Sequence, residues 1–258
     1  MLPYPALDPV AFRIGPLAVR WYGLAYLSGF LLGAWVLRRQ ARAGRLPLGP
    51  GEVGDLVGWL VLGVVLGGRL GYVLFYNAPY FATHPWKIVA VWEGGMSFHG
   101  GLLGVGVALW AYARRHRADP WVLADGLALA APPGLFFGRL ANFVNGELYG
   151  RVSDLPWAMV FPGGGPLPRH PSQLYEAGLE GPLLGLVLWL LWRRRPAPGL
   201  TAAAFLGGYA LVRFGVEFVR EPDPQLGFVL GPLTMGQCLS LAMALGAAVL
   251  AGVRRRAA

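Results

Sequence analysis

Seven residues whose side chains could do chemistry stand at the edges of apolar stretches of this sequence. They are Tyr22, Arg69, His99, Arg139, Asn142, Arg213 and Glu217. A charge at the centre of a membrane-spanning helix costs about 2.5–3.5 kcal/mol on insertion scales, so such a residue is usually kept for function or for pairing. Arginines grouped in a dry site suit a phosphate-bearing anion such as a lipid headgroup, because the guanidinium donates two parallel hydrogen bonds. His99 adds a group that can accept a proton near neutral pH.

These residues also have plainer explanations. An arginine near a helix end often extends its charged head to the lipid headgroups, although Arg69 and Arg213 have several apolar residues beyond them. His99 precedes two glycines at a predicted helix start, where a histidine often serves packing or capping. Arg213 and Glu217 are four residues apart, which predicts a local ion pair on one helical face.

The elements that position these residues are predicted to be membrane-spanning helices. Of the 258 residues, 55% are hydrophobic and only 14% are charged, against about a quarter charged in soluble domains. Seven apolar stretches reach or approach the length of about 20 residues that a spanning helix needs. They are Trp21–Leu37, Val53–Tyr76, Phe98–Ala113, Trp121–Phe137, Gly178–Trp192, Leu200–Val219 and Phe228–Val253. These runs lack the alternation of barrel strands, so we predict an all-α polytopic membrane protein with about seven transmembrane helices, a single domain over residues 1–258.

Clusters of arginine between these stretches predict the orientation of the chain. The clusters are Arg38–Arg45, Arg114–Arg117, Arg193–Arg195 and Arg254–Arg256. Cytoplasmic loops carry an excess of Arg and Lys, and all four clusters fall in the cytoplasm if the amino terminus faces outward. We therefore expect a multi-pass protein of the inner (cytoplasmic) membrane with a periplasmic amino terminus and a cytoplasmic carboxyl terminus. In that orientation, the seven polar residues all map to the outer half of the membrane.

The longest loop on the outer side is predicted to cover residues 138–177. It contains the Gly- and Pro-rich string FPGGGPLPRHP, and a loop of this length in a compact domain is usually functional. We expect it to form a small ordered periplasmic cap.

Charge and cysteine content exclude several other classes of protein. The net charge of +9 would suggest nucleic-acid binding in a soluble protein, but the arginines sit in short runs between apolar stretches. The expected partner is therefore the lipid bilayer and not a nucleic acid. Cys238 is the only cysteine, which excludes a disulfide and a zinc cluster. No group of Asp, Glu, His or Cys has metal-ligand spacing, so neither a metal nor another cofactor is expected.

One string in this sequence is long enough to be specific. GRLANFVNGELYGR, residues 138–151, closely resembles the signature of the prolipoprotein diacylglyceryl transferase family. Further blocks are similar to family blocks in the same order: VRWYGL around Tyr22, GGRLGYVLFY around Arg69, MSFHGGLLG around His99, RHPSQLYEA from Arg169 and RFGVEFVREPD from Arg213. The resemblance covers nearly the whole chain.

The resemblance implies an enzyme that moves a diacylglyceryl group from phosphatidylglycerol to the lipobox cysteine of a prolipoprotein signal peptide. A thioether forms and glycerol phosphate leaves. The family's site residues fall on Tyr22, His99, Arg139, Asn142, Glu147, Gly150, Arg213 and Glu217. We expect His99, Arg139, Arg213 and Glu217 to be catalytic and the others, with Arg69 and Asn145, to contact substrate. Asn142 and Asn145 have the alternative of simple turn chemistry.

Two ways of activating the acceptor thiol remain open at this point. Nearby cations lower the pKa of a thiol from about 8.5, so Arg213 could act by its charge, or His99 could take the proton directly. A transporter is a rival class, but such proteins usually contain two related halves, and none are seen here. A metal-dependent phosphatidyltransferase would need clustered aspartates, and Asp125 and Asp154 are isolated.

Overall fold

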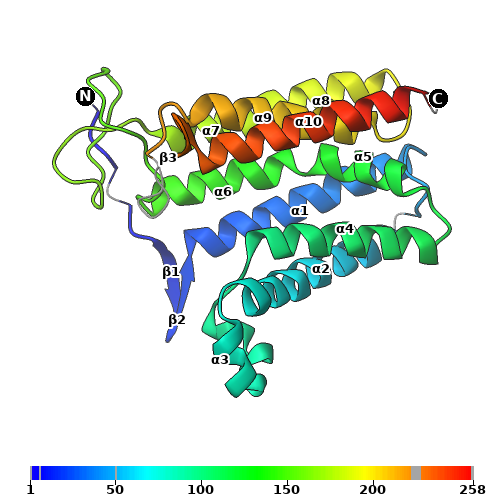
Figure 1. Cartoon of the computed structure of the whole chain (residues 1–258), viewed down its shortest axis with the longest axis horizontal. Helices are drawn as coiled ribbons and strands as arrows, with labels where there is room; N and C mark the ends of the chain where they lie inside the picture. Colours follow the sequence, from blue (N-terminus) through cyan, green and yellow to red (C-terminus); the bar gives the residue numbers. More distant parts are fainter. Residues whose placement is uncertain (1, 6, 50, 222–227, 257–258) are drawn as a thin grey trace. The chain divides into compact units, whose positions relative to one another are not determined.

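The structure, a computed structural model, describes residues 2–5, 7–49, 51–221 and 228–256, without the side chains of residues 17, 93, 98 and 99. It is mostly helical (Figure 1). The chain forms two compact units, which are considered one at a time below. The larger unit consists of Met1–Val36 and Asp125–Ala258, and the smaller unit consists of Leu37–Ala124.

Two closely packed helices make up most of the smaller unit. These are α2 (Glu52–Phe75) and α4 (Phe98–Arg115), joined by α3 (Ala78–Thr83), η1 (Pro85–Val89) and η2 (Val91–Glu93). Glycines line both sides of the helix interface: Gly63, Gly67 and Gly71 on α2, and Gly100 and Gly104 on α4. A Cβ atom on Gly67 would lie 2.8 Å from the Cα of Gly104. Small residues at this spacing let membrane helices approach closely and gain van der Waals contact.

Alanine at Gly67 is expected to destabilise the smaller unit, whereas alanine at Gly58 is not. Overpacking a tight interface typically costs about 1–3 kcal/mol, and the added methyl at Gly67 would overlap α4. Gly58 lies on the same helix with nothing within 4 Å of an added Cβ, so alanine there should be neutral or slightly stabilising. Thermal unfolding in detergent, followed by helical circular dichroism, compares the two variants. Equal melting temperatures of the two variants would contradict the close approach of α2 and α4 at Gly67.

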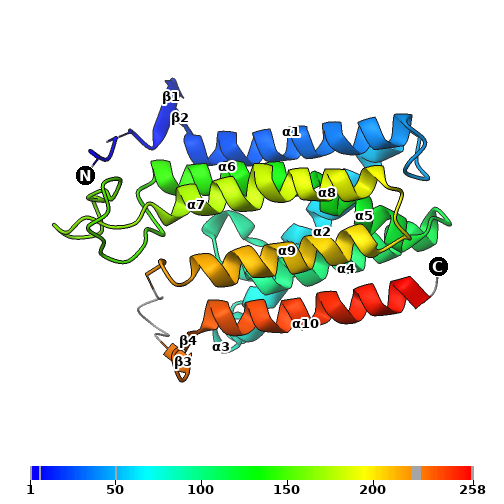
Figure 2. The ribbon, with the colours of Figure 1, turned by 90° about the horizontal axis from the view of Figure 1, so that it is seen from above.

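Helices also dominate the larger unit. They are α1 (Trp21–Arg42), which begins in this unit, α5 (Pro120–Ala130), α6 (Pro132–Val144), α7 (Ser172–Gly178), α8 (Leu184–Arg193), α9 (Leu200–Val216) and α10 (Met235–Arg256). A wider π-helical turn, η3 (Leu179–Leu183), joins α7 to α8 without a break. Within this unit, α9 lies between α8 and α10 (Figures 1 and 2).

A buried carboxylate fixes the start of α9. Asp125 accepts hydrogen bonds from the backbone N–H groups of Gly199 at 2.8 Å and Ala202 at 2.7 Å. These groups have no partners inside their own helix, and an anion is favoured at a helix amino terminus. Asp125 therefore acts as an N-cap supplied by another helix.

Helices occupy at least part of all seven predicted stretches. Among the residues that the structure describes, four helical segments are long and apolar enough to cross a membrane. The four are Glu52–Phe75, Pro120–Val144, Ser172–Arg193 and Met235–Arg256, and a shorter apolar helix covers Leu200–Val216. The expectation of a helical membrane protein is thus confirmed in this coarser form.

The predicted boundaries differ most from the structure at the last and the fourth stretch. The last stretch was expected to be helical from Phe228, but a hairpin of β3 (Phe228–Leu230) and β4 (Leu233–Thr234) precedes α10. A second hairpin, β1 (Val10–Ile14) with β2 (Leu17–Arg20), precedes α1. The fourth stretch was expected to end at Phe137, but α6 continues to Val144, because polar side chains on its last turns find buried partners.

The region between α6 and α7 has its own small core. Residues 145–171 join the two helices (Figure 1), so the loop is shorter than the predicted 138–177. Phe143, Met159 and Phe161 are buried together, with Tyr4, Tyr149 and Leu174 packed against them. The Tyr4 hydroxyl donates to the backbone oxygen of Phe143 at 2.7 Å, which ties the amino-terminal segment to this core. We call residues 145–171 the cap.

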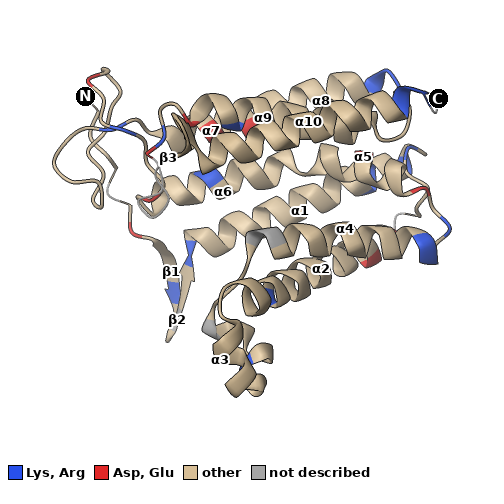
Figure 3. Cartoon of the chain, viewed as in Figure 1, with Lys and Arg blue, Asp and Glu red and all other residues tan. Residues whose placement is uncertain are grey.

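Arginine clusters gather at one end of each unit (Figure 3). In the smaller unit, the Tyr112 hydroxyl donates to the Glu52 carbonyl at 3.1 Å, so the Arg114–Arg117 end of α4 lies beside the start of α2. That start closely follows the Arg38–Arg45 cluster. In the larger unit, Arg254 donates to the Pro198 carbonyl at 2.7 Å, next to the Arg193–Arg195 cluster. In each unit, therefore, two arginine clusters lie at the same end, as they must if both face the same side of the membrane.

Candidate active site

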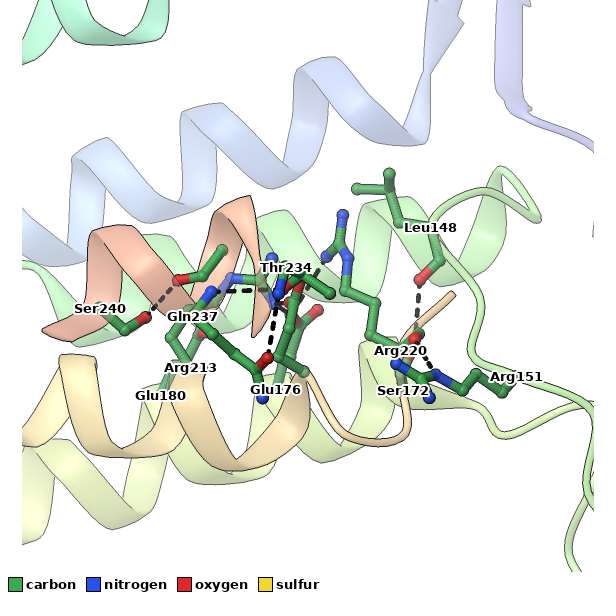
Figure 4. Close-up of polar contacts among 12 residues, drawn as sticks. Leu148, Arg151, Ser172, Glu176, Glu180, Arg213, Arg220, Thr234, Gln237 and Ser240 are labelled. Carbon is green, nitrogen blue, oxygen red and sulfur yellow. Dashed lines mark hydrogen bonds and ion pairs between the residues drawn. The ribbon is translucent and has the colours of Figure 1, made fainter. Parts of the chain in front are cut away.

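A buried network of three arginines and three glutamates lies among the helices of the larger unit. Figure 4 labels Glu176, Glu180, Arg213 and Arg220 of this network. Its members are Arg139 on α6, Glu176 on α7, Glu180 on η3, Arg213 on α9, and Glu217 and Arg220 just after α9. We call these six residues the charge cluster. The side chains of Glu176 and Glu180 have no exposed surface, whereas those of Arg139, Arg213 and Arg220 are 10–16% exposed. The carboxylates are thus enclosed, and the guanidinium groups form the accessible side.

Arg139 is held by two carboxylates. Its Nε and Nη2 atoms donate to Glu180 at 2.9 and 3.3 Å, which is the bidentate geometry typical of an arginine–carboxylate pair. Its Nη1 atom lies 3.2 Å from Glu176 Oε2. Gly181 allows this approach, since a Cβ atom there would lie 2.7 Å from the Cβ of Phe136 on α6. Two of the five guanidinium N–H groups donate hydrogen bonds, both to Glu180, and the Nη1 contact with Glu176 is an ion pair.

Glu176 is the hub of the charge cluster. One of its oxygens, Oε1, accepts hydrogen bonds from Arg213 Nη1 at 3.1 Å and from Arg220 Nη1 at 3.2 Å. Its other oxygen faces Arg139. A single carboxylate therefore contacts arginines from α6, from α9 and from the turn after α9.

The predicted ion pair between Arg213 and Glu217 is present. Arg213 Nη1 lies 2.6 Å from Glu217 Oε2, and the Thr234 hydroxyl donates to Glu217 Oε1 at 2.8 Å. Gly236 at the start of α10 leaves room for this carboxylate, because a Cβ atom there would lie 2.6 Å from Glu217 Oε1. Glu217 thus joins α9 to the start of α10.

Asn142, Asn145 and Glu147 lie together at the end of α6. Asn142 donates to Glu147 Oε1 at 2.8 Å and Asn145 donates to the same oxygen at 3.4 Å. Gln173 on α7 donates to the backbone oxygen of Glu147 at 2.6 Å. Tyr22, whose hydroxyl is 3.3 Å from that of Tyr26, lies within electrostatic range of Glu147 and Arg139. These residues therefore adjoin the charge cluster.

Gly150 serves backbone packing in the cap. It forms a β-bridge with Arg220, and its N–H donates to the His170 carbonyl at 2.9 Å. A Cβ atom at Gly150 would lie 2.6 Å from the Cβ of His170, so only glycine fits.

Burial lowers the pKa of the His170 imidazole, which keeps it neutral at pH 7. Its Nδ1 atom lies 3.2 Å from the Tyr175 hydroxyl.

Arg69 and His99 belong to the smaller unit. Arg69 is buried, and its guanidinium donates to the backbone oxygens of Lys87 and Ile88 at 2.5 and 2.8 Å and to those of Gly94 and Gly95. It therefore organises the connection between α2 and α4, a role that the sequence did not suggest. His99 lies in the first turn of α4, which Ser97 caps by accepting from the Gly100 N–H at 3.1 Å. The His99 side chain lies outside the described part of the structure.

Sequence reasoning missed three members of the charge cluster: Glu176, Glu180 and Arg220. A signal was present, because Glu176 and Glu180 are four residues apart and stand just before an apolar run. Carboxylates at that spacing share one helical face, and charges at membrane depth need partners. Arg220 follows Glu217 by three residues and could have been assigned to the same face.

The charge cluster is suited to holding an anion. With three arginines and three glutamates, its formal charges balance, while the exposed parts belong to the arginines. Fixed guanidinium N–H groups in a dry environment stabilise charge that gathers on a phosphate without needing to reorganise. Among the described residues, no three His, Cys, Asp or Glu side chains are grouped as a metal site.

Comparison with known proteins places the chain in a family. A profile described as prolipoprotein diacylglyceryl transferase matches residues 9–253. A protein of Nitratidesulfovibrio vulgaris named phosphatidylglycerol–prolipoprotein diacylglyceryl transferase is 58% identical over 243 residues, covering 93% of this chain and 91% of the relative. Relatives of the same name from Geobacter sulfurreducens and Rhodospirillum rubrum are 56% and 55% identical, covering 93% and 99% of this chain and 92% and 95% of their own lengths. The chain belongs to the prolipoprotein diacylglyceryl transferase family.

Proposed function

We propose that this protein transfers the diacylglyceryl group of phosphatidylglycerol to the thiol of the lipobox cysteine in a prolipoprotein signal peptide. The observation that carries the proposal is the charge cluster, whose partly exposed arginines suit a lipid phosphate. The names of the family and of its relatives support the substrates.

The reaction is a displacement at the glycerol carbon that bears the phosphate. The acceptor sulfur forms a bond to this carbon, the bond from carbon to the phosphate oxygen breaks, and glycerol phosphate leaves with the electron pair. The proton of the thiol passes to His99 or to the departing phosphate. No nucleophile from the enzyme is required, which suits a chain whose one cysteine, Cys238, lies on α10.

Arg139 and Arg213 have different proposed roles. Arg139 keeps further N–H groups beyond the two that it donates to Glu180, and these donate to the phosphate as it becomes a monoester. Arg213 lowers the pKa of the incoming thiol by its charge. Glu217 supports Arg213 at 2.6 Å. Tyr22, Asn142, Asn145 and Glu147 contact the headgroup, and Gly150 keeps the cap beside them. Arg69 is proposed to contact substrate and His99 to be catalytic.

The whole chain, residues 1–258, is proposed to act as one transferase of the cell inner membrane. All seven predicted helices cross the bilayer, the amino terminus and the cap face the periplasm, and the carboxyl terminus faces the cytoplasm. The pairing of arginine clusters at one end of each unit supports this orientation.

A reporter fused after Ala258 is expected to be active only if it is a cytoplasmic one. Positively charged loops stay in the cytoplasm, and the last cluster, Arg254–Arg256, ends α10. Paired fusions to a cytoplasmic reporter and a periplasm-dependent reporter at the same position provide the measurement and its control. Activity of the periplasm-dependent fusion would move the charge cluster to the wrong leaflet and contradict the orientation.

Purified full-length protein is expected to transfer diacylglyceryl from phosphatidylglycerol to a synthetic lipobox peptide. The product is detected by mass spectrometry as a peptide with one diacylglyceryl thioether. A peptide with serine in place of the cysteine is the acceptor control, and phosphatidylethanolamine is the donor control. Failure of the wild-type protein to modify the cysteine peptide would overturn the proposed function.

A further inference from the structure

The number of its arginine partners sets Glu176 apart from the other carboxylates that the structure describes. Its side chain has no exposed surface, yet it contacts three arginines within 3.2 Å. Glu180 is equally buried but pairs only with Arg139 among the described ion pairs. Removing Glu176 would therefore affect all three guanidinium groups at once, whereas removing Glu180 would affect one.

The contacts of Glu176 fix the arginines from their enclosed side. Arg139 reaches it from α6. Arg213 and Arg220 reach it from α9 and the turn that follows (Figure 4). Each arginine keeps 10–16% of its side chain exposed. A carboxylate behind the guanidinium planes restricts their rotation and leaves their remaining N–H groups for a ligand on the accessible side.

Charge balance separates this positioning effect from simple attraction. The three arginines and three glutamates of the charge cluster cancel in formal charge. With one phosphodiester bound, the cluster and its ligand together carry one net negative charge. With glutamine at position 176, the same set with a bound phosphodiester would be neutral. Loss of the Glu176 charge should therefore leave phosphatidylglycerol binding unchanged or tighter, even though the arginines lose their common anchor.

We propose that Glu176 is a positioning residue for transfer, holding Arg139, Arg213 and Arg220 in the geometry that the departing phosphate and the thiol require. The proposal rests on the proposed function of the charge cluster. Misplacement of a reacting group by about 1 Å can cost about 10²-fold in rate. Glu176→Gln should therefore lower kcat by about 10²-fold without raising the KM for phosphatidylglycerol.

The experiment compares variants of the full-length protein in mixed micelles of phosphatidylglycerol with a lipobox peptide. Glu176→Gln removes the charge and keeps the shape, while Glu176→Asp keeps the charge and shortens the reach by one methylene. Glu221→Gln is the matched control, since Glu221 pairs with Arg169 of the cap at 2.8 Å and lies outside the charge cluster. kcat and KM are normalised to the folded fraction measured by size exclusion and circular dichroism.

A second measurement tests whether Glu176 acts through Arg213. If it does, Glu176→Gln should lower kcat much less in an Arg213→Ala background than in the wild type, because the positioned group is already absent. Additive losses in the double variant would overturn the link between these two residues. This readout does not depend on overall stability, since a purely structural role would affect both backgrounds alike.

The outcomes separate the positioning role from the proposed function. A lower kcat with unchanged KM in Glu176→Gln, with normal kinetics in Glu221→Gln, supports the positioning role. If Glu176→Gln fails to fold, Glu176→Asp decides by the same criterion of lowered kcat at unchanged KM. Undiminished kcat in either folded variant, or a rise in KM alone, would overturn the positioning role and leave the proposed function intact. Absence of transfer by the wild type would overturn the proposed function and the positioning role together.

Discussion

Replacing Arg139 by lysine is expected to lower transfer by about 10²- to 10³-fold, the loss typical of removing one transition-state donor. Lysine keeps the positive charge but offers a point donor in place of a planar fork. It could not bind both oxygens of Glu180, as Arg139 does at 2.9 and 3.3 Å, and also reach Glu176. Fewer N–H groups would then remain for the phosphate.

The same substitution should also lower the stability of the larger unit. Lysine keeps the charge but cannot donate to both oxygens of Glu180, which is fully buried, and leaving a buried acceptor without its hydrogen bond typically costs about 1–3 kcal/mol. Transfer rates are therefore compared per folded protein, with Arg38→Lys as the control because Arg38 is exposed on α1. A near-normal transfer rate in Arg139→Lys would contradict the proposal that transfer requires the planar two-donor geometry of arginine.

Alanine at Arg213 is expected to lower transfer at least about 10²-fold at neutral pH, while lysine should retain much of the activity. The reason is that Arg213 is proposed to act by charge, which lysine keeps. Arg213 contacts Glu176 at 3.1 Å and Glu217 at 2.6 Å through the same atom, Nη1. The single nitrogen of a lysine side chain could therefore replace it.

The pH dependence of transfer distinguishes the two roles. An acceptor thiol has a pKa of about 8.5 when no cation is near, so above that pH it is mostly thiolate whether or not Arg213 is present. The deficit of the Arg213 variants should therefore shrink as assay pH rises toward 8.5, whereas the deficit of Arg139→Lys should not. If both lysine variants keep normal rates and His99→Ala alone abolishes transfer, a histidine general base replaces this electrostatic account.

Periodicity and composition were sufficient to predict most of the helices. Long apolar runs define membrane helices because every backbone polar group in lipid must bond within its own helix. The pair Arg213–Glu217 was predictable for a similar reason, since residues four apart share a helical face. The group of Asn142, Asn145 and Glu147 was predictable because its members lie within six residues of each other.

The partners that depend on packing between distant helices were not predictable. Arg139 and Glu180 are 41 residues apart, and their pairing depends on how closely η3 approaches α6 at Gly181. The role of Arg69 was missed for a related reason, because its acceptors are backbone oxygens that any residue could supply. The hairpin at Phe228 was also missed, because its residues are as apolar as those of α10, which follows it directly.

The spread of the charge cluster along the chain has a consequence for biogenesis. Arg139 leaves the ribosome 37 residues before Glu176, and Arg213 follows 37 residues after it. The translocon therefore receives α6 before Glu176 and Glu180 exist to pair with Arg139, and an unpaired charge in an inserting helix is unfavourable. Glu176 and Glu180 arrive next and neutralise Arg139, but they then carry a negative charge in excess until α9 delivers Arg213. Nascent chains that stop before α9 thus contain one carboxylate more than arginines among the members of the charge cluster.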